Sequence, residues 1–473
     1  MSENGVSRRR ILGAALAQGV GRVSAPLVMT GFVRPARASV GQLRAGPMRG
    51  HSTPRSAWFW LQTESACDLR LEYWDLQRPG QRLQTSVTRT HATESHCVHA
   101  RLGTLSPGAS YAVQPLIDGE VALEEPVVFQ TEAAFPRAGQ AADATLLAGS
   151  CARTHDPLFG ESAPTDGRYG IFETMAREQA DAMVWLGDNV YFRAGSGHLR
   201  AFDREGMDHR YRHTRALDAL QPLLRGPRHL AIWDDHDYGP NNPGQEWIFK
   251  DTSLTLFKRY WCNASYGLPG LDGVFGVDRV SDVDLFLLDG RYYRDDQYLK
   301  GVPDKQMLGA GQMRWLQNSL LQSTARFKVI CNGTSVLTNW VMQGEGWEYA
   351  PEGWRNYAAE RAAFMRWLKT NDVRGVIFLS GDRHFTQLLR QERDGQYPLY
   401  EIVTSPLTAG PSRDLGNEPD NPLVVEGTLH ARHNYCRMRV VGAAEERRLE
   451  VTVRGTQGEI LWQRIITAAE LGN

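Results

Sequence analysis

Four short segments combine an apolar run with Cys, Asp, Tyr or His at its end. They are Leu146–Cys151, Met183–Tyr191, His229–Asp237 and Val376–His384. Each run is typical of a buried parallel strand, and in open α/β sheets the chemistry gathers beyond the carboxyl ends of such strands. Because these polar groups are costly to desolvate unless they bind something, the four segments together predict a metal cluster.

A hydrolytic site with two metals needs a carboxylate that bridges both ions. Asp188 is the best candidate, since it directly follows Gly187, where the backbone can turn sharply. Tyr191, three residues later, can bend back toward the same site. A phenolate from Tyr191 and a thiolate from Cys151 near one cation favour a strongly polarising ion such as ferric iron.

Hard oxygen ligands are supplied by the other segments. These are Asp234, Asp235, Asp382 and the side chain of Asn241 or Asn242. Calcium and magnesium prefer such ligands, so the mixed set indicates two unlike ions. Zinc alone would instead indicate an ordinary binuclear site. His236 and His384 are candidates to ligate, to orient a ligand or to give a proton to a leaving oxygen.

Each group also has a simpler interpretation. Asp382 and His384 taken alone are typical of a structural hydrogen-bonded pair, Tyr191 of a packed aromatic ring, and Cys151 of a small buried apolar residue. Because all of these residues lie at strand ends, we favour a shared metal site over the simpler interpretations. The three acids within Asp234–Asp237 would repel one another without a cation, which favours a site.

Other charged residues give weaker indications. Arg153, Arg259 and Arg383 are candidates to clamp a phosphate through two nitrogens, although surface arginines are common. We interpret Asp289, paired with Arg291, as a support at the rim. The aromatic-rich segment from 340 to 354 either shapes a substrate cleft or simply packs.

The length of 473 residues indicates two or three domains. Hydrophobic residues make up 42% and charged residues 23%, which is the globular norm. With 53 basic and 54 acidic residues, the chain has no general attraction for nucleic acid or anionic membranes. We therefore expect no nucleic-acid-binding domain.

Residues 1–38 resemble a twin-arginine export signal, because Ser7–Arg10 precedes the apolar run Ile11–Ala17 and Ala36–Ala38 offers a cleavage site. A disordered basic tail is the alternative. The apolar stretch is too weak for a stable membrane anchor, and no later segment has about 18 uninterrupted apolar residues. We expect a soluble periplasmic or secreted protein with the twin-arginine machinery as its export partner.

Six cysteines are few for this length, so disulfides are not the scaffold. Cys67 and Cys97 lie in the same region and would pair only if their distance allows it.

Three regions follow the export signal. Short alternating runs over residues 41–132 predict a β-sandwich, and Leu105–Tyr111 resembles a turn of fibronectin type III-like domains. A linker rich in Ala, Gly and Pro covers about residues 133 to 143. Residues 145–473 alternate strands and helices, as in α/β layering, and end in runs typical of an antiparallel meander with one wet face.

The ordered motifs resemble the PhoD-like alkaline phosphatase family of the metallophosphoesterase superfamily. They are Gly46-Pro-Met with Trp58-Phe-Trp, Gly149-Ser-Cys151, Leu186-Gly-Asp188 with Tyr191, Trp233-Asp-Asp-His-Asp237, Met307-Leu-Gly309 through Gln312 and Trp315-Leu316, and Ser380-Gly-Asp-Arg-His384. The resemblance covers about residues 45 to 465. Asn189 and Phe192 depart from the frequent family wording.

The resemblance implies an αββα metallophosphoesterase sandwich, preceded here by the fibronectin type III-like module, with ferric iron and one or two calcium ions. It places Cys151, Asp188 and Tyr191 around iron, and Asp234, Asn241 or Asn242, Asp382 and His384 in the rest of the cluster. The implied activity is hydrolysis of small phosphate esters. From the residues themselves we expect His236 or His384 to assist the leaving alkoxide and Arg259 to clamp the phosphate. The alternatives are a phospholipase D-like phosphodiesterase and a non-catalytic binding protein with a structural metal.

Overall fold

The computed structural model describes residues 42–133, 142–192, 202–338, 342–344, 347–349, 352–443 and 446–473. The predicted export signal and most of the predicted linker lie outside these residues. Among the helices described, none has the length and apolar character needed to cross a membrane.

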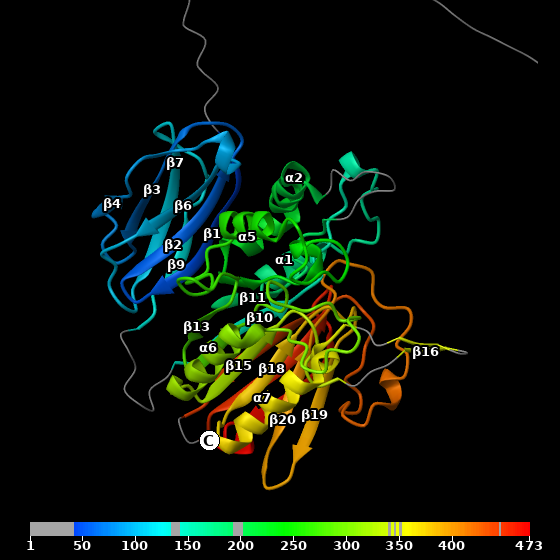
Figure 1. Cartoon of the computed structure of the whole chain (residues 1–473). Helices are drawn as coiled ribbons and strands as arrows, with labels where there is room; N and C mark the ends of the chain where they lie inside the picture. Colours follow the sequence, from blue (N-terminus) through cyan, green and yellow to red (C-terminus); the bar gives the residue numbers. More distant parts are fainter. Residues whose placement is uncertain are drawn as a thin grey trace, which may run out of the picture. The chain divides into compact units, whose positions relative to one another are not determined.

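Two antiparallel sheets form the N-terminal region (Figure 1). One contains β1 (Leu43–Thr53), β2 (Ser56–Thr63) and β6 (Cys97–Leu102); the other contains β3 (Asp68–Asp75), β4 (Arg82–Gln84), β5 (Thr88–Arg89), β7 (Ser110–Ile117), β8 (Glu120–Val121) and β9 (Val127–Gln130). Phe59, Leu71 and Val113 from both sheets share one buried core. Cys67 and Cys97 are both free thiols, so the possible disulfide is not formed.

The first sheet of the larger region has the order β12-β11-β10-β21-β22-β23. Its strands are β10 (Ala144–Gly149), β11 (Ala182–Leu186), β12 (Arg228–Ile232), β21 (Asn434–Val441), β22 (Arg448–Gly455) and β23 (Ile460–Thr467). The first three are parallel to one another, whereas β21 to β23 form an antiparallel meander. Buried and half-buried residues alternate along β22, which confirms the predicted meander with one wetter face.

The second sheet has the order β13-β14-β15-β18-β20-β19. Its strands are β13 (Gly276–Val280), β14 (Val283–Leu287), β15 (Phe327–Asn332), β18 (Val376–Ser380), β19 (Gln387–Arg393) and β20 (Gln396–Val403), and β16 (Met342–Gly344) pairs separately with β17 (Trp347–Tyr349). Val184 of the first sheet and Val329 of the second belong to one apolar cluster. The two sheets therefore pack face to face.

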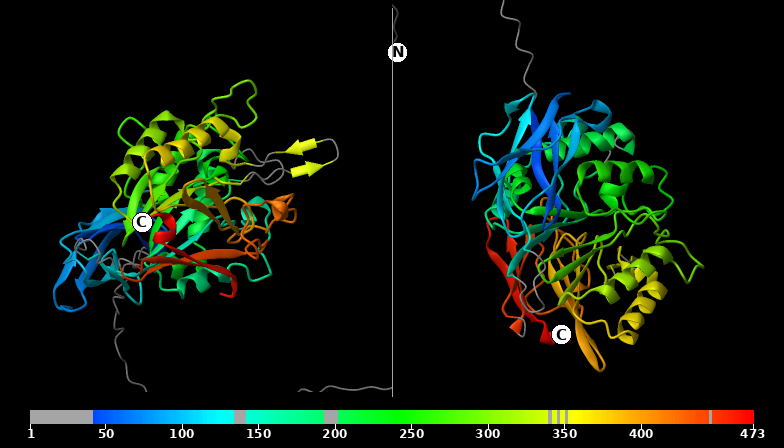
Figure 2. Two further views of the ribbon diagram at one scale, coloured as in Figure 1. Left: turned by 90° about the horizontal axis from the view of Figure 1, so that it is seen from below. Right: turned by 90° about the vertical axis from the view of Figure 1, so that its left-hand side faces the viewer.

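Helices cover both outer faces. The helices are α1 (Gly170–Ala176), α2 (Arg204–Arg215), α3 (Gln221–Arg225), α4 (Asp235–Tyr238), α5 (Lys250–Tyr260), α6 (Gly309–Gln322) and α7 (Ala358–Thr370), with short 3-10 turns η1 (Ala92–Glu94), η2 (Pro157–Phe159), η4 (Asp218–Leu220), η5 (Trp354–Tyr357), η6 (Glu418–Asp420) and η8 (Ala469–Leu471). Apolar residues of α1, α2, α3 and α5 pack on the first sheet, and those of α6 and α7 pack on the second. Figure 2 shows α6 and α7 on the side of the second sheet away from the red C-terminal strands. The layers are α, β, β and α, as predicted.

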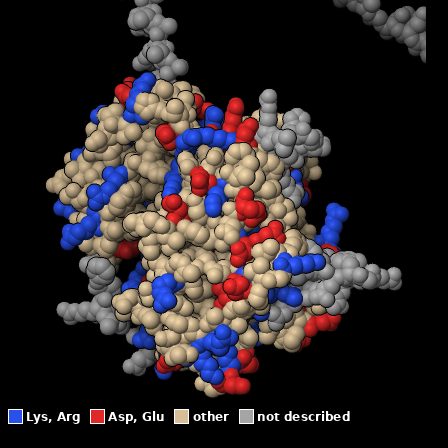
Figure 3. Space-filling view, in the orientation of Figure 1, with Lys and Arg blue, Asp and Glu red and all other residues tan. Residues whose placement is uncertain are grey.

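Basic and acidic side chains are interspersed on the face shown in Figure 3. This mixture agrees with the nearly balanced composition of the whole chain.

The strand register brings the predicted segments together. Gly149 at the end of β10 lies opposite Trp185 of β11, and Leu186 at the end of β11 lies opposite Ile232 of β12. The three loops that follow therefore leave from one sheet edge. The fourth segment follows β18, a parallel strand of the second sheet, so the site lies where the two sheets meet.

Candidate metal centre

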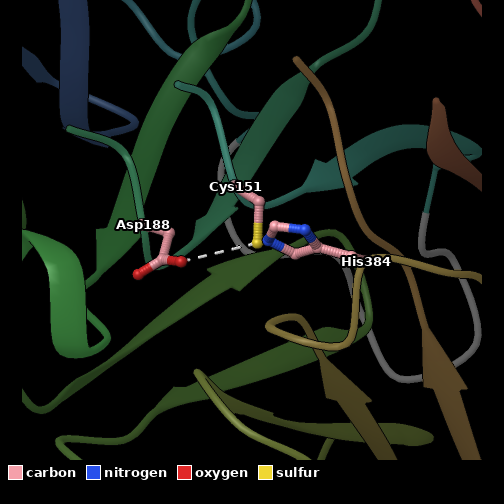
Figure 4. Close-up of side chains that lie close together, drawn as sticks. All are labelled: Cys151, Asp188 and His384. Atoms are coloured by element: carbon pink, nitrogen blue, oxygen red, sulfur yellow. Dashed lines mark hydrogen bonds between the residues drawn. The ribbon is translucent and has the colours of Figure 1, made fainter. Parts of the chain in front are cut away.

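Cys151, Asp188 and His384 converge from three different strand ends (Figure 4). The Cys151 thiol donates a hydrogen bond to Asp188 Oδ2 at 3.6 Å. The His384 Nδ1 atom lies 2.6 Å from the Gly410 carbonyl oxygen, so Nδ1 carries the proton and Nε2 is the atom able to bind a metal. Thiol, carboxylate and imidazole ligand atoms lie within 4.8 Å of one another.

Tyr191 contacts the same carboxylate. Its hydroxyl donates a hydrogen bond to Asp188 Oδ2 at 3.0 Å, while the backbone N–H of His236 donates to Asp188 Oδ1 at 3.1 Å. The rings of Tyr191 and His236 lie 4.4 Å apart between centroids. Thiol and phenol thus meet on one oxygen of Asp188, and the second oxygen is held by the start of α4.

A second group contains Asp234, Glu352 and Asp382, each offering a carboxylate oxygen within 4.8 Å of the others. Arg291 binds Asp234 Oδ1 through Nε at 2.8 Å and Nη2 at 2.5 Å, and its Nη1 lies 2.5 Å from Glu352 Oε1. Arg294 also pairs with Glu352. These two arginines supply fixed positive charge on one side of the group.

Asp235 and Asn242 connect the two groups. The Asn242 backbone N–H donates to Asp235 Oδ2 at 2.9 Å. With its amide turned to make hydrogen bonds, the Asn242 side chain donates to Glu352 Oε2 at 2.8 Å and to Asp235 Oδ2 at 3.2 Å. The opposite amide orientation presents the oxygen to the same carboxylates, which is the orientation a bound cation would select.

Five of these residues have left-handed backbone conformations. They are Cys151 (φ 58°), Asp188 (φ 54°), Asn242 (φ 59°), Asp382 (φ 66°) and His384 (φ 56°). Such conformations are uncommon outside glycine and cluster at functional sites. At the four residues other than Asn242, they turn the chain sharply after a strand, so the side chain faces the cluster instead of continuing the strand's alternation. Asn242 lies in the loop after α4.

Two glycines make room for Asp234. A Cβ added to Gly187 (φ +88°) would lie 2.6 Å from the backbone nitrogen of Asp234, and a Cβ added to Gly333 would lie 2.6 Å from its carboxyl carbon. Glycine is therefore required at position 187 for two reasons: the backbone has a positive φ, and the ends of β11 and β12 approach each other closely there.

Burial and neighbouring charges shift the pKa values of the acidic residues in the cluster. Burial, followed by the charge of Asp235, raises the pKa of Asp188 well above its ordinary value. Burial and the charge of Glu352 raise the pKa of Asp382 to about 6. Burial alone would raise the pKa of Asp235, but His236 and Arg291 hold it below its usual range. Burial also raises the pKa of the Cys151 thiol to about 12.

The donor set fits bound cations. Asp188, Asp234 and Asp235 are at most 3% exposed, and within the described part of the chain Asp234 Oδ2 has no hydrogen-bond partner. Such an oxygen costs free energy unless an ion or ordered water binds it. A thiol and a phenol with raised pKa values become anions only beside a strongly polarising ion, whereas the carboxylate-rich side suits a hard cation.

The structure brings the predicted metal ligands and His236 together, but it does not bring Arg153 or Arg259 to them. Arg153 pairs with Glu161 at 2.7 Å. Arg259 of α5 instead pairs with Glu94 at 3.0 Å and with Asp208 at 3.4 Å, and its carbonyl accepts a hydrogen bond from Trp60. These contacts connect α5 to the N-terminal sheets and to α2, and they do not place Arg259 as a phosphate clamp at the cluster.

Glu352 is a site residue that sequence reasoning missed. It lies in the segment after β17, and no apolar strand directly precedes it. The pairing of Asp289 with Arg291 also differs from the expectation. Asp289 accepts the Arg291 backbone N–H and the Trp233 indole N–H, so the guanidinium is available to Asp234 and Glu352.

Comparisons with known proteins agree with this architecture. A family model described as PhoD-like phosphatase matches residues 281–453, which include Asp382 and His384. Alkaline phosphatase D of Bacillus subtilis (strain 168) is 25% identical over 255 residues. That match covers 46% of this chain and 43% of the relative, so the chain spans less than half the length of the curated relative it matches.

Solved structures show the same fold. A structure of PhoD matches with a TM-score of 0.74 at 18% identity, covering 92% of this chain and 90% of that one. The purple acid phosphatase PPD1 from yellow lupin (Lupinus luteus) seeds matches with a TM-score of 0.62 at 10% identity, covering 90% of this chain and 75% of that one. Both likenesses extend over the layered sheets that carry the cluster, which is a metallophosphoesterase fold. The family model, the curated relative and the fold agree, and the chain is similar to PhoD-like phosphatases over residues 281–453.

Proposed function

We propose that the protein is an exported, metal-dependent hydrolase of small phosphate esters. The observation that carries this proposal is the meeting of the Cys151 thiol and the Tyr191 phenol on Asp188 Oδ2, at 3.6 and 3.0 Å. Cys151, Asp188 and Tyr191 would hold ferric iron. Asp234, Asp235, Asn242 and Asp382 would hold one or two calcium ions, with Glu352 as an additional carboxylate. His384, which lies with Cys151 and Asp188, would complete the cluster.

The bound cations would polarise the phosphoryl oxygens and lower the pKa of the attacking water. Asp188 contributes the shared carboxylate, whose Oδ1 is fixed by the His236 backbone N–H. Asp237 fixes the segments that follow β11 and β12, because its carboxylate accepts the backbone N–H groups of Asp188, Asn189 and Asp234. These bonds keep the ligand geometry rigid before substrate binds.

Substrate would approach from the side where Asn242, Asp382, Arg383 and His384 are only half-buried. On that side Arg383 supplies a positive charge for the phosphate. Since His384 would face a cation with Nε2, the proton for the leaving alkoxide would come from His236. Its Nε2 lies 3.9 Å from Asp235 Oδ2, so the imidazole lies beside a carboxylate.

The metal content of the folded protein, purified without chelators, tests the cluster. We expect iron and calcium together in wild type and loss of iron in Asp188→Asn. Asp372→Asn is the matched control, because Asp372 is an exposed carboxylate paired with Arg374. Zinc as the sole metal, or iron retained at full content in Asp188→Asn, would contradict the mixed cluster.

Hydrolysis assays test the activity. An aryl phosphate monoester and the matching diester, compared at equal concentration, would both be supplied to wild type, Asp188→Asn and Asp372→Asn. We expect turnover of at least one ester in wild type and the control, and its loss in Asp188→Asn. A metal-loaded wild type inert toward both esters would favour the binding-protein alternative, and turnover of the diester alone would favour a phosphodiesterase.

Export is tested separately. Arg8→Lys with Arg9→Lys should leave the full-length protein folded inside the cell, while wild type moves to the periplasm or medium. Equal distribution of the two would contradict a twin-arginine signal over residues 1–38.

A further inference from the structure

We propose a second metal site, for a single divalent transition ion, formed by Asp156, His209 and His213. One ligand atom from each residue lies within 4.8 Å of the other two. His209 Nε2 is 2.7 Å from Asp156 Oδ2, and His213 Nδ1 is 4.0 Å from the same oxygen. None of the three belongs to the groups of the catalytic cluster.

The second nitrogen of His213 orients the ring. His213 Nε2 lies 2.9 Å from the His155 carbonyl oxygen, which requires the proton on Nε2. Nδ1 of neutral His213 therefore carries the lone pair and faces Asp156. Histidine ligands in metal sites characteristically donate their other N–H to a carbonyl or carboxylate in this way.

Asp156 is held in place before any ion binds. Its side chain is only 3% exposed, and its Oδ1 accepts the Leu158 backbone N–H at 2.9 Å at the start of η2. The Asp156 backbone N–H donates to Glu161, which also binds Arg153 and Arg210. The loop therefore presents Oδ2 to the two imidazoles with little freedom to move.

The two histidines lie four residues apart on α2, labelled in Figure 1, and so occupy one face of the helix. Their rings stack with centroids 6.2 Å apart at an interplanar angle of 16°. Their side chains are 36% and 31% exposed, which leaves an entry path and room for water. The site is thus half open on one side and fixed by a buried carboxylate on the other.

Two imidazoles and one carboxylate suit zinc, cobalt or nickel and do not suit calcium, which prefers oxygen ligands. An ion would lie between the ligand atoms, at about 2.0–2.2 Å from each. Small ring movements would lengthen the 2.7 Å distance between His209 Nε2 and Asp156 Oδ2 and shorten the 4.0 Å distance between His213 Nδ1 and the same oxygen. A bound ion would connect the loop that follows Cys151 to α2.

The test is a titration of the purified, metal-containing protein with cobalt(II), followed by visible absorption and by bound metal after desalting. We expect the wild-type protein to bind one more equivalent of cobalt(II) than His209→Asn or His213→Asn. Apparent affinity at this site should fall at least about 100-fold in either variant, because loss of a direct ligand exceeds the 10–100-fold effect of outer partners. His430→Asn is the control, since His430 is half-buried and belongs to none of the candidate metal groups.

The Asp188→Asn variant distinguishes this site from the catalytic cluster, because it changes a residue of the cluster alone. It should still bind the additional equivalent of cobalt(II). Equal cobalt uptake by wild type and both histidine variants would overturn the proposal, as would loss of that equivalent in Asp188→Asn alone. Should one histidine variant unfold, Asp156→Asn provides the same comparison, because Oδ1 still accepts the Leu158 N–H while the anionic ligand is lost.

Discussion

Arg291 holds Asp234 through two nitrogens, at 2.5 and 2.8 Å, in a place where neither side chain is more than 2% exposed. This guanidinium is a permanent cation among carboxylates that otherwise depend on bound ions. Removal of one partner of such a pair leaves an uncompensated buried charge.

Arg291→Met should therefore lower the free energy of unfolding by about 3–5 kcal/mol, measured by denaturant unfolding of the metal-free protein. Added calcium should recover part of the loss, because a cation can neutralise Asp234 and Glu352. Arg374→Met, which removes an exposed ion pair, should lower the free energy of unfolding far less. An equal decrease in the free energy of unfolding in both variants would show that the buried ion pair stabilises the fold no more than the exposed one.

Tyr191→Phe should fold normally but lose visible colour if the phenolate binds ferric iron. The phenol packs against His236, so a phenyl ring retains the packing and removes only the oxygen. The measurement is the absorption spectrum of the iron-containing variant beside Tyr298→Phe, an exposed tyrosine. An unchanged spectrum at unchanged iron content would exclude Tyr191 as a ligand.

Relative to the metal-loaded protein, the metal-free protein should lose stability as the pH rises from about 4 to about 7. Burial raises the pKa of Asp382 to about 6 and of Asp237 to about 7, from an ordinary value of 3.8. At these two carboxyl groups the folded state therefore binds more protons than the unfolded state within this window, so their contribution to the free energy of unfolding falls as pH increases.

Cations bound at or beside these carboxyl groups would favour their ionised forms, so the metal-loaded protein should not show this decline. Denaturant unfolding from pH 5 to 8, with and without a chelator, gives the two profiles. Their difference isolates the cluster, because all other titrating groups are common to both. Parallel profiles would contradict a site that binds cations at these carboxylates.

Gly333→Ala should reduce ester turnover at least about tenfold, because the new Cβ would lie 2.6 Å from the Asp234 carboxyl carbon and displace that group. Gly170→Ala is the control, since a Cβ there meets nothing within 4 Å. Activity in the metal-loaded Gly333→Ala protein equal to that of the control would show that Asp234 tolerates the shift.

The strand ends were predictable from the sequence because each combines a short buried apolar run with a ligand placed after it. The structure confirms strands at all four positions, and Cys151, Asp188, Asp234 and Asp382 come together at their ends. Periodicity along one strand cannot assign it to a sheet, however. The division of the segments between two sheets required the three-dimensional fold.

Residues outside that pattern were harder to find. Glu352 follows no apolar run like those of the four predicted segments. Arg259 has the charge of a phosphate clamp but pairs instead with Glu94. The histidine spacing on α2 was visible in the sequence, yet the third ligand, Asp156, comes from a distant loop. Side-chain direction and long-range pairing are set by tertiary packing, which local residue types do not specify.

Ser405 donates a hydrogen bond to the Cys151 sulfur at 3.1 Å, although 254 residues separate them along the chain. Contacts of such long sequence separation form slowly, because the entropy of closing the intervening loop must be overcome first. Cys151 and its neighbours therefore acquire their final geometry only after the β18 sheet has docked on the β10 sheet. High-affinity metal uptake by this centre should accordingly report completion of folding, and a nascent chain that ends before β18 should not acquire it.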